Sequence, residues 1–195
     1  VLTRRVDNPE SWLQTRLKYR LFDKVIAISE GIRTILISEG VPAQKVVCVR
    51  SAVDLQQYSA PCDDAWFRNE FGLAHEVKVI GMVAQFIERK GHRYLLQAIP
   101  EILSKYPRVK FILFGKGPLT EDIRAMALAA GIQSSLIFAG FRNDLERVLP
   151  CLYAIVHPAE MEGLGVSLLQ AAACRVPLIG THVGGIPEII KDGID

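Results

Sequence analysis

Residues 77–115 have the sequence VKVIGMVAQFIERKGHRYLLQAIPEILSKYPRVKFILFG. Its first and last parts, Val77–Ala84 and Val109–Gly115, are nearly continuous apolar runs, which are typical of strands covered on both faces of a sheet. Between them, Gly91–Tyr106 carries apolar residues at helical spacing, although Pro100 should kink that helix or remove one of its hydrogen bonds. Strand, helix and strand at this spacing predict a βαβ unit with a right-handed crossover and a parallel sheet.

The same alternation continues on both sides of this unit. Further strands are predicted at Lys24–Ile28, Lys45–Val49, Leu136–Ala139, Tyr153–His157 and Pro177–Gly180. Further helices are predicted near residues 9–20 with a start at Asn8 and Pro9, at Glu30–Glu39 capped by Ser29, at Glu121–Ala130 capped by Thr120, at Gly163–Cys174 and at Ile186–Lys191. The fold class is therefore α/β, with a Rossmann-like parallel sheet that has helices on both faces.

One interval, residues 51–64, interrupts the alternation with polar turn-forming residues and no hydrophobic period. We interpret residues 51–61 as a connection between two domains. Residues 1–50 are then the C-terminal part of one Rossmann-like domain, and residues 62–195 are a second domain, truncated at its C-terminus. Because Val1 is not a natural start and Asp195 ends the chain abruptly, we expect this sequence to be part of a longer protein.

Composition excludes several classes of protein. The 23 Lys and Arg residues nearly balance the 21 Asp and Glu residues, and a net charge of +2 is too small to argue for a nucleic-acid-binding protein, in which a concentrated basic face is expected. No window of eighteen apolar residues exists that could cross a membrane. The four cysteines are scattered, with no zinc spacing, so we expect reduced thiols in a cytosolic protein, most of them filling the core, and no bound metal.

Ligands of open parallel sheets bind at the carboxyl ends of the strands, so the segments that follow the strands are the candidate sites. After the first strand of the opening unit, Lys90 precedes a helix that begins at Gly91, where a cation and backbone N–H groups could hold a phosphate. The alternative is a solvated basic loop. After the next strand, Gly115–Pro118 could let a ligand approach closely, but a plain turn is the simpler interpretation.

The strongest candidate follows the strand that ends at His157. Glu162 lies at the rim of a glycine-containing helix start, Gly163–Val166, whose N–H groups and dipole favour a phosphate oxygen. Gln170 lies about two helical turns further on, so that Glu162 and Gln170 could border one ligand. The alternative is that the acidic residues only complement the helix dipole. We interpret His157 itself as a packed, hydrogen-bonded residue rather than a general base.

In this order and spacing, the motifs resemble those of group 1 (family 4) glycosyltransferases of the GT-B fold, over nearly the whole chain. The resemblance rests on Lys24–Glu30, Lys45–Asp54, Val83–Gly91, Glu162–Gln170 in place of an E-x7-E motif, and Pro177–Glu188. It implies an enzyme that transfers a sugar from a nucleotide-sugar to a glycan or lipid-linked acceptor, such as a lipopolysaccharide precursor. It further implies a retaining reaction without metal or cofactor, in the cytoplasm or at the inner face of the membrane, with peripheral membrane contact through the N-terminal domain.

The resemblance also implies roles for particular residues. Lys90 would hold the diphosphate. Glu162 would contact the donor sugar and is the candidate catalytic residue. The Gly163, Leu164, Gly165 and Val166 backbone would face sugar and phosphate, and Gln170 would bind the ribose. Two positions depart from the family pattern, because Gln85 replaces an arginine of the phosphate loop and Gln170 replaces the second glutamate. Both leave a hydrogen-bonding group without charge, so we expect weaker donor binding.

Two alternatives to this function remain open. One is another GT-B enzyme, such as a nucleotide-sugar 2-epimerase or a glycogen synthase-like transferase. The other is a non-catalytic nucleotide-sugar-binding module, in which Gln85 and Gln170 reflect a degenerate pocket. The family's usual catalytic histidine would lie outside this sequence, so we expect the chain to be inactive alone.

Overall fold

The computed structural model describes residues 1–8 and 10–193, so Pro9, Ile194 and Asp195 lie outside the described residues. Its contacts divide the chain into two units. The first contains Val1–Ala52 with Met161–Val166 and residues from His182 onward, and the second contains Val53–Glu160 and Ser167–Thr181.

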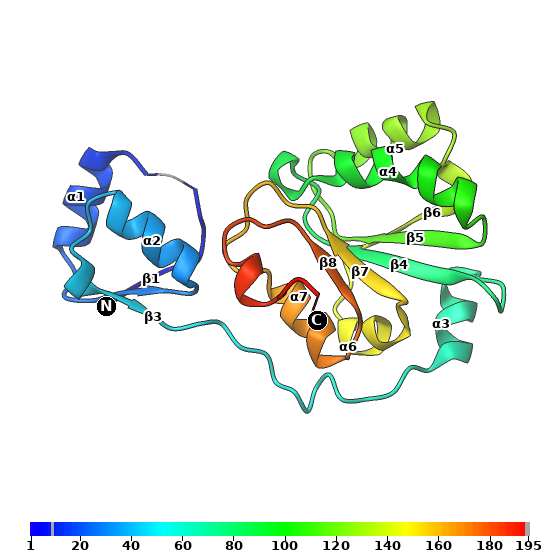
Figure 1. The fold of residues 1–195 in the computed structure, drawn as a ribbon, viewed down its shortest axis with the longest axis horizontal. Coiled ribbons are helices and arrows are strands. Elements are labelled where there is room, and N and C mark those ends of the chain that lie inside the picture. Colours follow the sequence, from blue (N-terminus) through cyan, green and yellow to red (C-terminus); the bar gives the residue numbers. More distant parts are fainter. Residues whose placement is uncertain (9, 194–195) are drawn as a thin grey trace. The chain divides into compact units, whose positions relative to one another are not determined.

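The first unit is built on a three-stranded parallel sheet in the order β1-β2-β3 (Figure 1). Its elements are β1 (Leu2–Arg4), α1 (Trp12–Arg20), β2 (Val25–Ala27), α2 (Glu30–Ser38) and β3 (Val46–Cys48). β1 was not predicted, because it has only three residues and one of them is an arginine. α1 begins later than predicted, since Ser11 and Gln14 form a capping box at its start.

The second unit contains a five-stranded parallel sheet in the order β6-β5-β4-β7-β8. Its strands are β4 (Lys78–Val83), β5 (Val109–Phe114), β6 (Leu136–Gly140), β7 (Ala154–His157) and β8 (Leu178–Gly180). Its helices are α3 (Asp64–Phe71), α4 (His92–Lys105), α5 (Thr120–Ala129), α6 (Leu145–Val148) and α7 (Val166–Ala173). Figure 1 shows α4 and α5 on one side of this sheet and α3, α6 and α7 on the other. The predicted α/β class with parallel strands is confirmed.

The core of the second unit lies between its sheet and α4 and α5. It is formed by buried side chains of both layers, among them Met82, Leu96, Ile99, Phe111, Leu113, Ile123 and Ala127. α4 runs continuously from His92 to Lys105 with Pro100 inside it. Thr120 is the first residue of α5 rather than its cap, and its hydroxyl donates to the Gly117 carbonyl at 2.7 Å.

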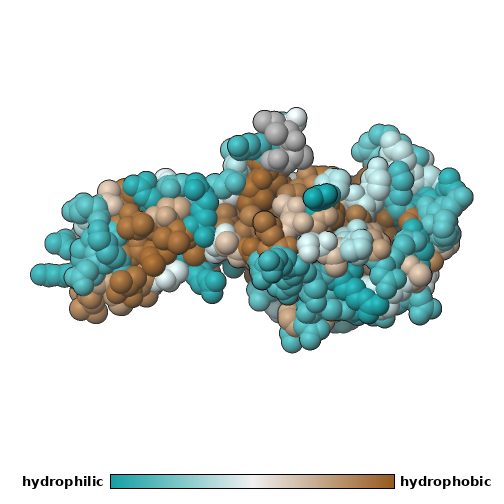
Figure 2. Space-filling model, turned by 90° about the horizontal axis from the view of Figure 1, so that it is seen from below, coloured by the Kyte–Doolittle hydropathy of each residue, from teal (hydrophilic) through white to brown (hydrophobic). Residues whose placement is uncertain are grey.

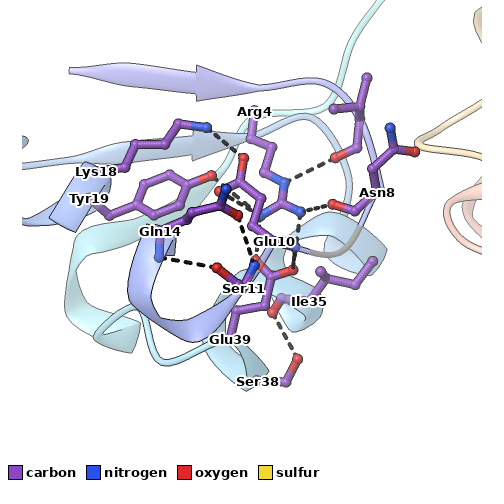
Figure 3. Close-up of polar contacts among 11 residues, drawn as sticks. Arg4, Asn8, Glu10, Ser11, Gln14, Lys18, Tyr19, Ile35, Ser38 and Glu39 are labelled. Carbon is purple, nitrogen blue, oxygen red and sulfur yellow. Dashed lines mark hydrogen bonds and ion pairs between the residues drawn. The ribbon is translucent and has the colours of Figure 1, made fainter. Parts of the chain in front are cut away.

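A buried arginine organises the first unit (Figure 3). The Arg4 side chain is 3% exposed and donates to both carboxylate oxygens of Glu39, at 2.5 and 3.2 Å. It also donates to the Tyr19 hydroxyl at 3.3 Å, to the Val6 carbonyl at 3.1 Å and to the Asn8 carbonyl. A buried guanidinium needs this full set of acceptors, because each donor left without one carries a desolvation cost. The cluster therefore ties the end of β1 to α1 and to the C-terminus of α2.

The first unit also exposes apolar side chains, and Figure 2 shows apolar surface on it. Among its described residues, the exposed large hydrophobic ones include Val1, Val6, Leu13, Leu17, Leu21, Val47, Val49 and Val166. Within the described part of the chain, no helix is long and apolar enough to cross a membrane.

The expectation of four reduced cysteines, most of them filling the core, is wrong. Cys62 and Cys151 form a disulfide across 89 residues of sequence, with their Cα atoms 4.8 Å apart. Cys48 and Cys174 are free and half-buried. The bond joins the end of the irregular connection to the short turn that follows α6. Sequence spacing could not show it, because the two partners meet only after the sheet has formed.

The disulfide predicts the number of reactive thiols in the isolated protein. Purified without reductant and unfolded in guanidinium, the described chain should expose two thiols to a thiol reagent, and four after reduction. The variant Cys151→Ser should expose three under both conditions, because Cys62 loses its partner. Four reactive thiols before reduction would contradict the bond.

Candidate functional site

The carboxyl ends of β4, β5 and β6 border a pocket of about 290 Å³ in the second unit. Its lining residues come from the three strand ends and the segments after them: Val83, Ala84, Gln85, Phe114, Gly115, Lys116, Phe141, Arg142 and Leu145. The predicted residue Gln85 is therefore a pocket residue. Lys116 lies in the candidate segment Gly115–Pro118. Phe141 and Arg142, which follow β6, were missed, although the rule that favours strand ends would have found both.

Arg142 is fixed at the pocket by two carboxylates. Its Nε and Nη2 atoms donate to Asp144 at 2.8 and 2.6 Å, and Nη1 donates to Glu70 at 2.6 Å. These hydrogen bonds, to Asp144 first and then to Glu70, raise the pKa of Arg142, and Arg142 lowers the pKa of Asp144. The guanidinium is thus a fixed part of the pocket wall, and the carboxylates of Asp144 and Glu70 balance its charge.

The glycines after β5 pack against the backbone after β4. A Cβ on Gly115 would collide with the Ala84 carbonyl oxygen, and one on Gly117 would collide with that of Phe86. The Phe86 amide also donates to the Lys116 carbonyl at 3.2 Å. Glycine at these two positions therefore lets the two backbone segments approach each other closely. This supports the plain-turn interpretation, and the close approach also shapes the pocket floor.

Lys90 ends a single 3-10 turn, Glu88–Lys90, directly before Gly91. Gly91 has a left-handed conformation, φ +72°, and is the N-cap of α4, so the predicted position of Lys90 just before a helix is confirmed. The turn is fastened to the segment after β7, because the Glu160 amide donates to the Arg89 carbonyl at 2.8 Å. The Tyr94 hydroxyl donates to the Glu160 carboxylate at 2.6 Å, which braces the same contact.

Two buried histidines lie near this turn. His157, at the end of β7, is 3% exposed, in line with the packed role expected for it. His92, the first residue of α4, is equally buried and stands edge-on to Phe86 with 4.6 Å between ring centroids. Burial first, and then the proximity of His157, lowers the pKa of His92 to about 4, so its ring is neutral at pH 7.

Glu162–Gly165 forms a loop, and α7 begins only at Val166. The prediction that Gly163 and Gly165 open the helix is wrong, because Gly165 has φ +92°, which lies outside helical geometry. Glu162 therefore precedes α7, and the helical relation to Gln170 inferred from spacing does not hold. The loop is fastened within the first unit: the Gly185 amide donates to the Glu162 carbonyl at 3.1 Å, and a Cβ on Gly184 would collide with that carbonyl oxygen.

Gln170 lies on α7, half-buried. Its Nε2 atom is 2.6 Å from the Tyr58 hydroxyl, to which it donates. Tyr58 comes from the irregular segment before α3 and was missed, because nothing in that segment's pattern marks a buried residue. No group of three or more His, Cys, Asp or Glu side chains suited to a metal ion occurs among the described residues.

The chain is an α/β chain of parallel sheets, with a pocket at the strand ends of the second unit, and its fold matches solved GT-B glycosyltransferases over about half of their length. One is HepE of Anabaena in complex with UDP-glucose, with a TM-score of 0.87 and 22% identity over 98% of this chain and 56% of that one. The chain belongs to the family of glycosyl transferases group 1, whose model matches residues 64–195. The resemblance inferred from the motifs is thereby confirmed.

Two relatives show the range of the family. The 2-deoxystreptamine glucosyltransferase of Streptomyces kanamyceticus is 28% identical, over 95% of this chain and 49% of the relative. The GDP-mannose-dependent alpha-(1-6)-phosphatidylinositol monomannoside mannosyltransferase of Mycolicibacterium smegmatis is 29% identical, over 88% of this chain and 47% of the relative. The chain spans about half the length of these relatives.

Proposed function

We propose that the protein to which this chain belongs transfers a sugar from a nucleotide-sugar donor to an acceptor, and that residues 62–195 bind the donor. The observation that carries this proposal is the pocket at the ends of β4, β5 and β6, bordered by Gln85 and Phe141. Its place at the strand ends is where nucleotide ligands bind in open α/β sheets, and an exposed aromatic ring such as Phe141 suits a nucleobase.

The donor's remaining groups would be bound by the residues that the family resemblance marks. Lys90 holds the diphosphate, Glu162 contacts the donor sugar, and the backbone of Gly163–Val166 faces sugar and phosphate. Gln170 accepts a hydrogen bond from the ribose. The reaction needs neither metal nor cofactor and retains the anomeric configuration, and the acceptor is a glycan or lipid-linked precursor.

The donor is tested by calorimetric titration of the full-length protein with UDP-, GDP- and ADP-sugars. HepE was solved with UDP-glucose, and the mycobacterial relative uses GDP-mannose, so the panel must include both bases. Tight binding of one donor supports the proposal. If a donor binds but its sugar is not transferred when acceptor extracts are added, the non-catalytic module is favoured. If no donor binds, the proposal is overturned.

Removing the Lys90 charge should weaken binding of the cognate nucleoside diphosphate by about tenfold or more, since hydrogen bonds to charged groups contribute about 1.5–3 kcal/mol. The variant is Lys90→Ala, measured by the same titration. Lys105→Ala is its control, because Lys105 lies at the far end of α4 and pairs with Glu101 on the surface. Equal affinity of wild type and Lys90→Ala would remove Lys90 from the site.

The reaction would take place in the cytoplasm, at the inner face of the membrane. Disulfides are rare in that compartment, so the state of Cys62 and Cys151 in living cells is a direct test. Rapid alkylation before lysis should find both thiols reduced if the location is correct. A bond already formed in cells would overturn it.

A further inference from the structure

The segment between β3 and α3 is irregular, yet one of its side chains is buried. Tyr58 is 5% exposed, whereas Leu55, three residues earlier, is 68% exposed. The same segment is tied to the second unit again at the Cys62–Cys151 disulfide. The buried Tyr58 ring thus anchors the connection to the second unit, which a linker that only spaces two domains does not require.

The Tyr58 hydroxyl holds the side-chain amide of Gln170. The Nε2–Oη distance is 2.6 Å, and this is a side-chain contact between residues 112 positions apart. A glutamine amide has one donor end and one acceptor end. With Nε2 committed to Tyr58, the Oε1 atom is left as an acceptor. Burial is the main cause that raises the pKa of Tyr58, so its hydroxyl stays protonated and neutral at pH 7.

The neutral side chain of Gln170 binds a ligand more tightly when the hydrogen bond to Tyr58 fixes its conformation beforehand. An unrestrained glutamine loses rotamer freedom when it binds, and this loss is comparable to the gain from one neutral hydrogen bond. A partner that fixes the rotamer beforehand removes most of that cost. By fixing this rotamer beforehand, Tyr58 therefore compensates for the binding affinity that the glutamine lacks without a carboxylate charge.

We propose that Tyr58 is a positioning residue for donor binding: it orients Gln170 so that Oε1 accepts a hydrogen bond from a ribose hydroxyl of the donor nucleotide. The inference rests on the proposed function, because it takes the ribose as the partner of Gln170. It makes the segment before α3 part of the donor site. It also predicts that recognition of the ribose, rather than of base or diphosphate, depends on Tyr58.

The test compares full-length wild type and variants in titrations with the cognate nucleoside diphosphate and with its 2′-deoxy and 3′-deoxy forms. Wild type should prefer the ribose form by about 2- to 12-fold over one of the deoxy forms, the range for one neutral hydrogen bond. Tyr58→Phe should lose most of that preference while its affinity for the deoxy form stays unchanged. Gln170→Ala should lose the preference as well, and the double variant should lose no more than either single one.

Two further variants separate positioning from folding. Gln170→Glu should keep the ribose preference, since its carboxylate can accept from the Tyr58 hydroxyl and from ribose. Tyr153→Phe should match wild type, because Tyr153 is 55% exposed and its ring lies under Lys78, where only the face is used.

The outcomes distinguish this inference from the function on which it rests. If wild type binds no nucleotide, the proposed function fails. If wild type prefers the ribose form and Tyr58→Phe keeps that preference, or loses affinity equally for ribose and deoxy forms, Tyr58 is structural only and the inference is overturned. A wild type that binds without ribose preference overturns the role of Gln170 and the inference together.

Discussion

Gly91→Ala should lower the free energy of unfolding by about 2–5 kcal/mol, from a backbone penalty of about 1–2 kcal/mol and a packing penalty of about 1–3 kcal/mol. The backbone penalty arises because Gly91 has φ +72°. The packing penalty arises because a Cβ there would collide with the Pro158 carbonyl oxygen and lie 2.8 Å from its carbon. The turn cannot move away freely, since the Glu160 amide holds the Arg89 carbonyl.

Gly131→Ala is the matched control for this substitution. Gly131 has φ +67°, almost the same conformation, but no atom lies within 4 Å of a Cβ placed on it. Its cost should therefore be the backbone penalty alone, about 1–2 kcal/mol. Denaturant unfolding of both variants measures the difference. If Gly91→Ala and Gly131→Ala lower the free energy of unfolding equally, the contact between Gly91 and Pro158 carries no packing penalty.

The same pair of variants tests the donor site. Because Lys90 immediately precedes Gly91, a turn forced away from Pro158 would move the lysine. Gly91→Ala should reduce affinity for the cognate nucleoside diphosphate at least as much as Lys90→Ala, whereas Gly131→Ala should leave it unchanged. The site is thus coupled to a backbone contact that involves no charged group.

Strands and their parallel pairing could be predicted because a strand buried on both faces leaves a local mark. β4 and β5 appear in the sequence as apolar runs, and each begins and ends within about two residues of its predicted bounds. The order of the strands could not be predicted, since β7 lies beside β4 although two strands separate them in sequence. That order depends on packing between elements.

The start of α7 shows how a motif can mislead. Glycine at 163 and 165 followed by apolar residues resembles a helix opening, yet only the structure shows that Gly165 has φ +92°. The Glu162 carbonyl lies against Gly184 and accepts a hydrogen bond from the Gly185 amide. Glycines leave no hydrophobic pattern, so a close approach between two of their segments is invisible without coordinates.

Two long-range pairs outside the motifs could not be predicted for a similar reason. Tyr58 lies in a segment without period, and its partner Gln170 is 112 residues away. The Cys62–Cys151 pair spans 89 residues. Long-range pairs of this kind are fixed by tertiary structure, whereas Lys90 could be marked as a candidate from the sequence because a helix start follows it directly.

Arg4→Ala should destabilise the first unit by about 3–5 kcal/mol, the usual cost of removing one partner from a buried ion pair. The loss leaves the Glu39 carboxylate, whose side chain is 9% exposed, without its guanidinium. It also leaves the Val6 carbonyl without the Arg4 Nε–H group that donates to it at 3.1 Å. Arg4→Lys should recover little, because one ammonium cannot reach acceptors spread around a planar fork of five N–H groups.

Arg33→Ala is the control within the same unit, since Arg33 pairs with Glu30 on the surface at 38% and 45% side-chain exposure. That loss should cost no more than about 0.5 kcal/mol. Hydrogen exchange of α1 and β2 amides reports the first unit separately from the second, which matters because two units need not unfold together. Arg4→Ala should speed exchange in α1 and β2 and leave β4 and β5 protected. If the α1 and β2 amides exchange at the same rate in Arg4→Ala and Arg33→Ala, the buried cluster contributes no more to stability than a surface ion pair. The cluster then does not hold β1 to its helices.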